Sequence, residues 1–277
     1  MDISKVGFTE DLEDLNARLA RAEAEAEHLK KQVRMAVNLR YHLMPYIFPV
    51  FSDLKQVDVY ADQIGAARVG GDFFDILRID NDHIGILVAD IFDGGDAAAL
   101  FMVTFKLYLQ GEISMGFSPD KLMEVINNRL SRTNEDDLCL SAWYGEYEVS
   151  TGKISAVNAG HEPPIILRQD KAHVYEDNSF SYLLGVTEGV RYKSYDIALS
   201  PGDSLLLYTD GMVKAVNAEG VHYSTGRMAE VMEGCHGGSA EKIVEELQED
   251  LLKYAGEVPL PDDATLLCLK RKGANEL

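Results

Sequence analysis

The sequence predicts an α+β domain in which β-sheets pack face to face and helices cover them. The first observation is a series of short apolar segments, separated by turn signals, over most of the chain after residue 55. Segments of this kind, joined by turns such as IDNDH and STGK, indicate mostly antiparallel strands. The second observation is that helical segments are inserted in couples rather than after every strand. Strands that pair first, with helices added around them, are typical of layered α+β domains.

The strands are expected where β-branched and aromatic residues are dense between turn residues. They fall at 57–64, 72–79, 83–91, 139–149, 153–160, 163–168, 190–199, 204–211 and 264–270. Runs such as IGILVA and SLLLYT are apolar at nearly every position, so they should be central strands covered on both faces. Three helices are expected, each opening on an Asp or Ser that can cap it, at 96–110, 118–131 and 239–254.

Residues 10 to about 40 differ from the rest, because they lack Gly and Pro and are dense in Ala, Glu, Leu, Arg and Lys. They predict a helix that Pro45 ends. Two alternatives stay open, an amphipathic helix docked on the domain and a parallel coiled coil that makes the chain a homodimer. A strict seven-residue repeat favours the coiled coil, and it comprises Leu12, Leu19, Ala26 and Val33 together with Leu15, Ala22, Leu29, Ala36 and Leu43.

The expected organisation is therefore an N-terminal helical or coiled-coil segment over 1–44, one domain over 45–272 and a short tail over 273–277. A net charge of −20 argues against general binding to nucleic acid or anionic lipid, which demands clustered Lys and Arg. No apolar run approaches the roughly 20 residues of a spanning helix, and the first residues lack a signal-peptide pattern. We expect a cytoplasmic protein. The three cysteines are widely spaced, which predicts neither a disulfide framework nor a zinc site.

Acidic residues stand where several apolar runs begin or end, and no basic residue stands beside them in the sequence. A carboxylate at the end of a buried strand is costly unless a partner compensates for its desolvation. Mg²⁺ and Mn²⁺ bind oxygen ligands held on rigid elements, so one shared pair of such ions would account for the whole set. Taken singly, each could instead be a turn residue. The four are Asp72 in VGGDFFD, Asp90 in IGILVAD, Asp210 in SLLLYTDG and Asp262 in PDDATLL.

Two such ions would also supply a reactive group, since a water between them is acidified and aimed at a phosphorus atom. A metal-activated water would explain why the sequence offers no convincing side-chain nucleophile. It contains no GxSxG elbow, no HExxH and no GxxxxGK[ST] loop.

The order of five motifs makes the set more specific. GGDFFD, the strand ending in VAD before a glycine pair and an alanine-rich helix, NAGHEPP, PGDSLLLYTDG and DDATLL follow one another between about residues 40 and 271. This order closely resembles the SpoIIE/RsbU-like bacterial branch of the PPM (type 2C) metal-dependent serine/threonine phosphatases. The resemblance implies an αββα sandwich with two Mn²⁺ or Mg²⁺ ions at one end, hydrolysing phosphoserine or phosphothreonine on a protein.

Carried over by motif, Asp72 and Asp90 would bridge or flank both ions, and the backbone carbonyl of Ile91 would add an oxygen. Asp210 and Asp262 would complete the ligand set. Asp263 would either orient a water on a metal or cap its strand.

The chain departs from the family pattern DxSGxGxxAA, since it reads DIFDGGDAAA. Phe92 replaces a small hydroxyl residue and Asp93 replaces a glycine, so Asp93 is either a further ligand through water or a turn residue. Asp96 is expected to cap the following helix. These departures keep open an alternative function, a weakly active or inactive phosphatase fold that binds a phosphoprotein and relays a signal. A metal-dependent phosphoesterase acting on a small molecule is a third possibility.

Two other residues near the motifs have competing roles. His161 in NAGHEPP could protonate the leaving serine, or it could shape a turn with Asn158 and Gly160, which is the interpretation adopted. Arg68 could hold a phosphate or pair with a surface carboxylate. The resemblance further implies a small phosphorylated anti-sigma-factor antagonist of the STAS type as substrate. It also implies an upstream sensor or regulator that acts through the N-terminal helix.

Overall fold

The computed structural model describes residues 18–19, 21, 44–45, 48, 50–66, 70–92, 96–134, 137–176, 182–273 and 276. Nearly all of the predicted N-terminal helix lies outside these residues, and so does the predicted heptad seam apart from Leu19. Within the described ranges, no helix combines the length and apolarity required to span a bilayer.

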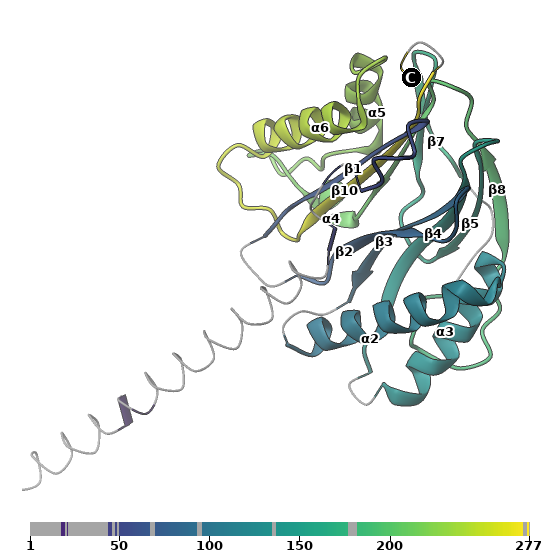
Figure 1. Cartoon of the computed structure of the whole chain (residues 1–277). Coiled ribbons are helices and arrows are strands. Elements are labelled where there is room, and N and C mark those ends of the chain that lie inside the picture. Colours follow the sequence, from purple (N-terminus) through teal and green to yellow (C-terminus); the bar gives the residue numbers. More distant parts are fainter. Residues whose placement is uncertain are drawn as a thin grey trace, which may run out of the picture.

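Two five-stranded antiparallel sheets stack face to face with helices on their outer faces (Figure 1). This confirms the predicted α+β sandwich. The first sheet has the order β1-β10-β9-β6-β7, formed by Val57–Ile64, Ala264–Arg271, Ser204–Tyr208, Ile165–Arg168 and Lys171–Val174. The second has the order β2-β3-β4-β5-β8, formed by Phe73–Arg78, His83–Ile91, Leu140–Glu148, Lys153–Ala159 and Ser194–Ala198.

The central strands are those whose sequences are apolar at almost every position. β9 is buried at all of its residues, and β10 and β3 are buried at all but one. A strand covered on both faces needs no alternation of polar and apolar residues, which explains these continuous runs. One core fills the space between the sheets and under α2 (Asp96–Glu112) and α3 (Pro119–Thr133). A second core lies under α5 (Thr225–Gly234) and α6 (Ala240–Ala255) on the outer face of the first sheet.

The three expected helices are present with ends shifted by at most two residues, as α2, α3 and α6. Ser239 caps α6 by accepting a hydrogen bond from the Lys242 N–H at 3.1 Å. Four elements were not expected, namely α5, the edge strand β7, the single turn α4 (Asp210–Lys214) and the 3₁₀ turn η1 (Ile113–Met115). The predicted strand over 190–199 is shorter, because only Ser194–Ala198 pairs with β5.

A buried ion pair joins α2 to the sheet beneath it. The Lys106 Nζ lies 2.6 Å from an Asp75 carboxylate oxygen, and both side chains are at most 7% exposed. Asp75 is the second acidic residue of GGDFFD and sits on β2. A buried carboxylate with a cationic partner has a structural explanation, so Asp75 does not compete with Asp72 for the role of ligand.

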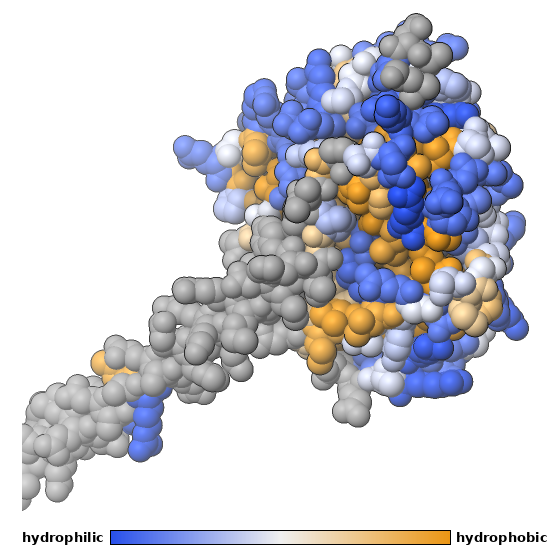
Figure 2. Space-filling view, in the orientation of Figure 1, coloured by the Kyte–Doolittle hydropathy of each residue, from blue (hydrophilic) through white to orange (hydrophobic). Residues whose placement is uncertain are grey.

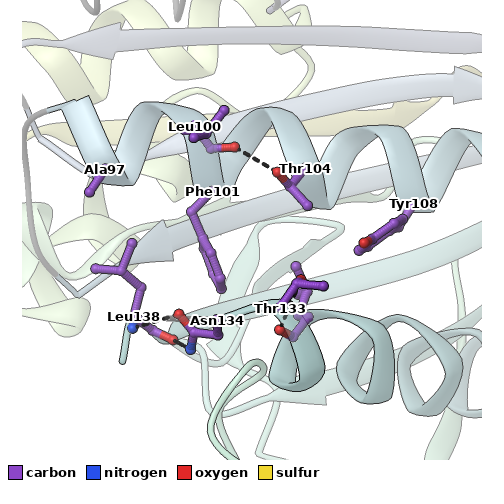
Figure 3. Close-up of a pocket in the computed structure, with 9 residues that line it drawn as sticks. Ala97, Leu100, Phe101, Thr104, Tyr108, Thr133, Asn134 and Leu138 are labelled. Carbon is purple, nitrogen blue, oxygen red and sulfur yellow. Dashed lines mark hydrogen bonds between the residues drawn. The ribbon is translucent and has the colours of Figure 1, made fainter. Parts of the chain in front are cut away.

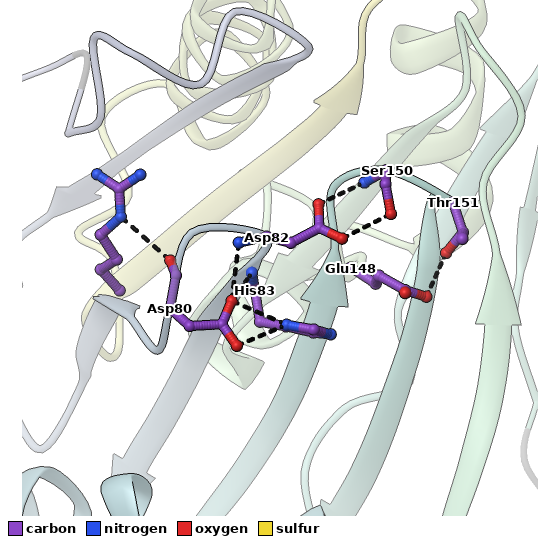
Figure 4. Close-up of polar contacts among 7 residues, drawn as sticks. Asp80, Asp82, His83, Glu148, Ser150 and Thr151 are labelled. Atoms are coloured by element: carbon purple, nitrogen blue, oxygen red, sulfur yellow. Dashed lines mark hydrogen bonds and ion pairs between the residues drawn. The ribbon is translucent and has the colours of Figure 1, made fainter.

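Acidic residues also cluster at the far end of the second sheet, where local hydrogen bonds account for them (Figure 4). Asp80 accepts hydrogen bonds from the backbone N–H groups of Asp82 and His83, and these bonds together with the His83 ring lower its pKa. Asp82 accepts from both the N–H and the hydroxyl of Ser150, which ties the β2–β3 turn to the β4–β5 turn. These carboxylates are turn residues. They provide a contrast for the carboxylates at the opposite end.

Candidate metal centre

Asp72 lies immediately before β2 and joins the two sheets. Its side chain is 1% exposed, and its Oδ2 accepts hydrogen bonds from the hydroxyls of Thr209, at 2.5 Å, and Thr265, at 2.7 Å. Both threonines belong to the first sheet or its continuation, whereas Asp72 leads into the second. Burial raises the pKa of Asp72 well above its ordinary value, and the nearby Asp90 raises it further. The carboxylate is thus fixed in place at an interior position where its charge is costly.

Asp90 lies near the end of β3 and is 6% exposed. Burial raises its pKa to about 7, and the charges of Asp210 and Asp262 also raise it. Carboxylates act on one another this strongly only at short range. Lys214 contacts both Asp210 and Asp262, and both aspartates act on Asp90, so carboxylates from three separate segments lie at one end of the sandwich.

Two glycines allow backbone segments to approach closely at this end. The Ile91 N–H donates to the Gly71 carbonyl at 3.2 Å, and a Cβ on Gly71 would lie 2.0 Å from the Ile91 carbonyl oxygen. Likewise, a Cβ on Gly211 would lie 1.8 Å from the Asp263 carbonyl oxygen. No side chain fits at either position. The glycines beside Asp72 and Asp210 are therefore required for close packing and do not only form turns.

Asp210 and Asp262 share a cationic partner that the sequence analysis did not anticipate. The Lys214 Nζ lies 2.7 Å from the Asp210 Oδ2 and 3.4 Å from the Asp262 Oδ2. The expectation that no basic residue lies beside the four aspartates is wrong at this point. The reason is local, because α4 begins at Asp210 and one helical turn brings residues i and i+4 onto the same face.

Asp263 is buried and holds the segment before the glycine pair. It accepts a hydrogen bond from the Ala66 N–H at 2.8 Å and one from the Gln63 side chain at 3.4 Å. These contacts fix its carboxylate between β1 and β10. Both roles considered for Asp263, orienting a water and capping the strand, stay predictions.

Glu162 is an acidic neighbour that the sequence analysis missed. Burial raises its pKa, the charge of Asp210 raises it further, and the charge of Lys214 lowers it. Its position after His161 in NAGHEPP was the available signal, but nothing in the sequence places that loop beside Asp210.

His161 belongs to the support of the site. Its side chain is 9% exposed, its Nδ1 lies 2.8 Å from the Ser141 hydroxyl, and burial lowers its pKa to about 4. Asn158 accepts from the His161 N–H and donates to the His161 carbonyl, which closes the turn. Burial thus favours the neutral form of His161, which supports the interpretation as a turn residue over that as a proton donor. Ser141 pairs with Asp90 in the β3–β4 register, so this contact supports the strand that carries Asp90.

Of the two residues that depart from the family pattern, Phe92 is the one that the structure describes. Asp93 and Arg68 lie outside the described residues. Phe92 is 48% exposed directly after Ile91, and its N–H donates to the Cys139 carbonyl at 2.9 Å. An aromatic ring therefore stands at the rim of the acidic centre where the family pattern has a small hydroxyl residue.

The acidic centre suits hard cations by its chemistry. The Asp210 Oδ1 is buried and has no hydrogen-bond partner among the described residues, and three of the four charged groups that act on Asp90 are aspartates. Uncompensated carboxylate oxygens on rigid strands are what Mg²⁺ and Mn²⁺ bind. No three acidic, His or Cys side chains in the described ranges already converge on a single point. Two of the four carboxylates contact Lys214 instead.

A groove of about 240 Å³ lies between α2 and α3 (Figure 3). Phe101 points into it from α2, and Leu138 and Asn134 close it from the α3–β4 connection. The outer face of α2 is also apolar (Figure 2), with Leu100 66% and Leu107 63% exposed. The groove contains no acidic cluster, in contrast to the strand ends.

An acidic centre at one end of two stacked antiparallel sheets, with helices outside, defines the class of the PP2C-type protein phosphatases. The model of the family described as stage II sporulation protein E (SpoIIE) matches residues 80–272. The chain belongs to this family, which confirms the resemblance carried by the motifs.

Relatives and solved structures agree with this assignment. Phosphoserine phosphatase RsbU of Bacillus subtilis (strain 168) is 24% identical over 246 residues, which cover 89% of this chain and 72% of RsbU. The SiaA-PP2C domain of Pseudomonas aeruginosa has a TM-score of 0.74 at 16% identity, covering 90% of this chain and 98% of that domain. RsbX, solved in complex with magnesium, has a TM-score of 0.57 at 17% identity and covers 77% and 94%. The chain spans only about 40% of the length of two further relatives.

Proposed function

We propose that the protein is a Mn²⁺- or Mg²⁺-dependent phosphatase that removes phosphate from serine or threonine in a regulatory protein. The observation that carries the proposal is that two buried carboxylates, Asp72 and Asp90, lie near the partly exposed carboxylates of Asp210 and Asp262 at one end of the sandwich. Asp72 and Asp90 come from the second sheet, and their raised pKa values reflect burial and mutual proximity. Asp210 begins α4 directly after β9, and Asp262 lies in the loop before β10, so both flank the first sheet.

Four carboxylates and the Ile91 carbonyl would hold two ions, with Asp263 and Asp93 as possible outer contacts through water. Two divalent cations so bound supply an acidified water and neutralise charge on the phosphoryl oxygens. The chain's own contribution is to hold these oxygens still. The hydroxyls of Thr209 and Thr265 fix Asp72, and the Gly71 contact fixes the Ile91 carbonyl. No described side chain at the centre is a convincing nucleophile, which agrees with a reaction that uses water.

The proposed substrate is a phosphorylated anti-sigma-factor antagonist of the STAS type. It is supported by the similarity to RsbU, whose name describes a phosphoserine phosphatase. Phe92 at the rim offers an exposed apolar surface to a protein substrate. We further propose that an upstream regulator acts through the N-terminal helix of a homodimer.

Hydrolysis of p-nitrophenyl phosphate in Mn²⁺ tests the reaction. We expect turnover that EDTA abolishes and that Asp90→Asn and Asp210→Asn reduce by at least about 100-fold, because each substitution removes a charged oxygen ligand. Asp82→Asn is the matched control. It also alters an acidic residue at a sheet end, but at the end where Ser150 satisfies it, and it should retain activity.

A panel of phosphorylated STAS domains, followed by phosphate release, then separates a protein phosphatase from an enzyme of small molecules. Absence of turnover on every substrate at saturating Mn²⁺ would contradict the proposal. That result would favour the alternative of an inactive phosphatase fold that docks a phosphoprotein, for which the Phe92 departure is the motivating observation.

A further inference from the structure

Lys214 places an ammonium group inside the acidic centre. It lies on α4, four residues after Asp210, and its Nζ contacts the Asp210 Oδ2 at 2.7 Å and the Asp262 Oδ2 at 3.4 Å. One cation thus joins the loop after β9 to the loop before β10. Its charge also acts on Asp90 and Glu162, where it partly offsets the rise in pKa that burial causes.

Lys214 occupies one oxygen of each carboxylate, the Oδ2 of Asp210 and the Oδ2 of Asp262. The Asp262 Oδ1 accepts a hydrogen bond from the Asp263 N–H at 2.9 Å. The other oxygen of this carboxylate, Oδ2, is the one that faces Lys214. On Asp210 the Oδ2 faces Lys214, and the buried Oδ1 has no hydrogen-bond partner in the described ranges. A carboxylate oxygen cannot be in close contact with an ammonium and a divalent ion in the same direction.

We propose that Lys214 is a built-in competitor for divalent cations at Asp210 and Asp262. A divalent ion can take the Oδ2 atoms of both carboxylates only by displacing the ammonium, so Lys214 raises the metal concentration at which the centre fills. This inference rests on the proposed function insofar as that function requires a metal at these residues.

The side chain is suited to such an exchange. Lys214 is 47% exposed, compared with 21% for Asp210 and 32% for Asp262. A compact ammonium on a flexible four-carbon stem can leave toward solvent without moving the backbone. The aspartates are anchored at rigid positions, because α4 begins at Asp210 and the Asp263 N–H holds Asp262. Release of the lysine is therefore the step that the structure permits.

Isothermal titration calorimetry with Mn²⁺ and with Mg²⁺ measures the competition directly. Of the two ions proposed for the centre, we expect the more weakly bound one to bind Lys214→Met about 3- to 10-fold more tightly than the wild type. The gain is modest because a partly exposed ion pair contributes little free energy. Lys214→Arg keeps the charge and the contacts and should bind as the wild type does. Lys253→Met is the matched control, because Lys253 makes the same i,i+4 pair with Glu249 away from the centre. At about 0.5 M salt, long-range repulsion between the lysine charge and the metal ion is screened. The gain in affinity for Lys214→Met should persist there, because direct competition for the oxygens does not depend on that repulsion.

Labelling of lysine amines, read by mass spectrometry, reports the displacement itself. With the full-length chain, we expect the rate of acetylation at Lys214 to rise when Mn²⁺ is added, while Lys253 is unchanged. Equal metal affinity of wild type and Lys214→Met, or a Lys214 labelling rate that Mn²⁺ leaves unchanged or lowers, would overturn the inference although metal binds. Absence of any metal-binding heat in both proteins would overturn the proposed metal centre, and the inference with it.

Discussion

Two buried carboxylates of the centre, Asp72 and Asp90, make the metal-free protein sensitive to pH. Both have pKa values raised by burial and by neighbouring carboxylates, to about 7 in the case of Asp90. The folded chain therefore holds protons that the unfolded chain releases near its ordinary pKa of about 4. The resulting contribution to stability is complete below the unfolded pKa and is lost as the pH rises through the folded pKa.

We predict that in EDTA the melting temperature falls as the pH rises from about 5 to about 8. Ionised carboxylates are favoured by a bound divalent ion, so saturating Mg²⁺ should reduce or reverse this fall. Differential scanning calorimetry over this pH range measures both effects.

Asp90→Asn should flatten the profile in EDTA by several degrees at the alkaline end, because the amide does not ionise. Asp82→Asn, at the far end of the sheet, should leave the slope unchanged. A melting temperature in EDTA that rises between pH 5 and pH 8 would contradict the assigned pKa shifts.

For single residues, the sequence indicates the candidate carboxylates but not their partners. Asp72, Asp90, Asp210 and Asp262 could be selected because each stands beside an apolar run. Lys214 could not, since its contact depends on a single turn of helix that a Thr-Asp-Gly sequence does not predict. Glu162 depends in the same way on the path of the loop after β5.

Helix α3 anchors the loop that contains Gly185 and Thr187, through hydrogen bonds of Asn127. Asn127 is fully buried, accepts from the Gly185 N–H at 2.9 Å and donates to the Thr187 carbonyl at 2.8 Å. Leu184 and Leu140 exchange backbone hydrogen bonds, and Leu140 pairs with Ile91 at the end of β3. The helix is thereby connected, through one loop and one strand, to the backbone that is predicted to bind a metal.

We predict that Asn127→Ala lowers the free energy of unfolding by about 2 to 4 kcal/mol, because it leaves buried backbone groups unpaired. Asn128→Ala is the control, since its bond to the Gly189 N–H is exposed, and it should cost less than about 1 kcal/mol. Urea unfolding measures both. Equal losses would show that the buried contacts of Asn127 do not anchor the loop.

Elements with strong patterns could be predicted, and short ones could not. The periodic helices α3 and α6 and the continuous apolar strands β3, β9 and β10 were expected within a few residues. β7 has the sequence KAHV and lies at a sheet edge, where exposed residues remove the apolar signal. α4 is five residues long, too short for a helical period to show.

The predicted coiled coil bears on the whole molecule, because it would bring two phosphatase domains together. We predict that the full chain sediments as a dimer and that a chain starting at residue 45 sediments as a monomer. Leu15→Glu with Leu29→Glu should also give a monomer, since both residues stand on the predicted seam. Ala17→Glu with Ala24→Glu adds the same charge off the seam and should remain dimeric. Monomers of equal activity in every case would exclude control by dimerisation.

The hydrogen bonds from Thr209 and Thr265 to Asp72 link the two sheets of the sandwich. One carboxylate fastens the start of β2 to the strands of the opposite sheet. Ions held between Asp72 and Asp90 on one side and Asp210 and Asp262 on the other would act as cross-links between the two halves of the sandwich. Metal supply would then govern the rigidity of the fold as well as its chemistry. Amide hydrogen exchange at the ends of β2, β9 and β10 would slow as the ion concentration rises.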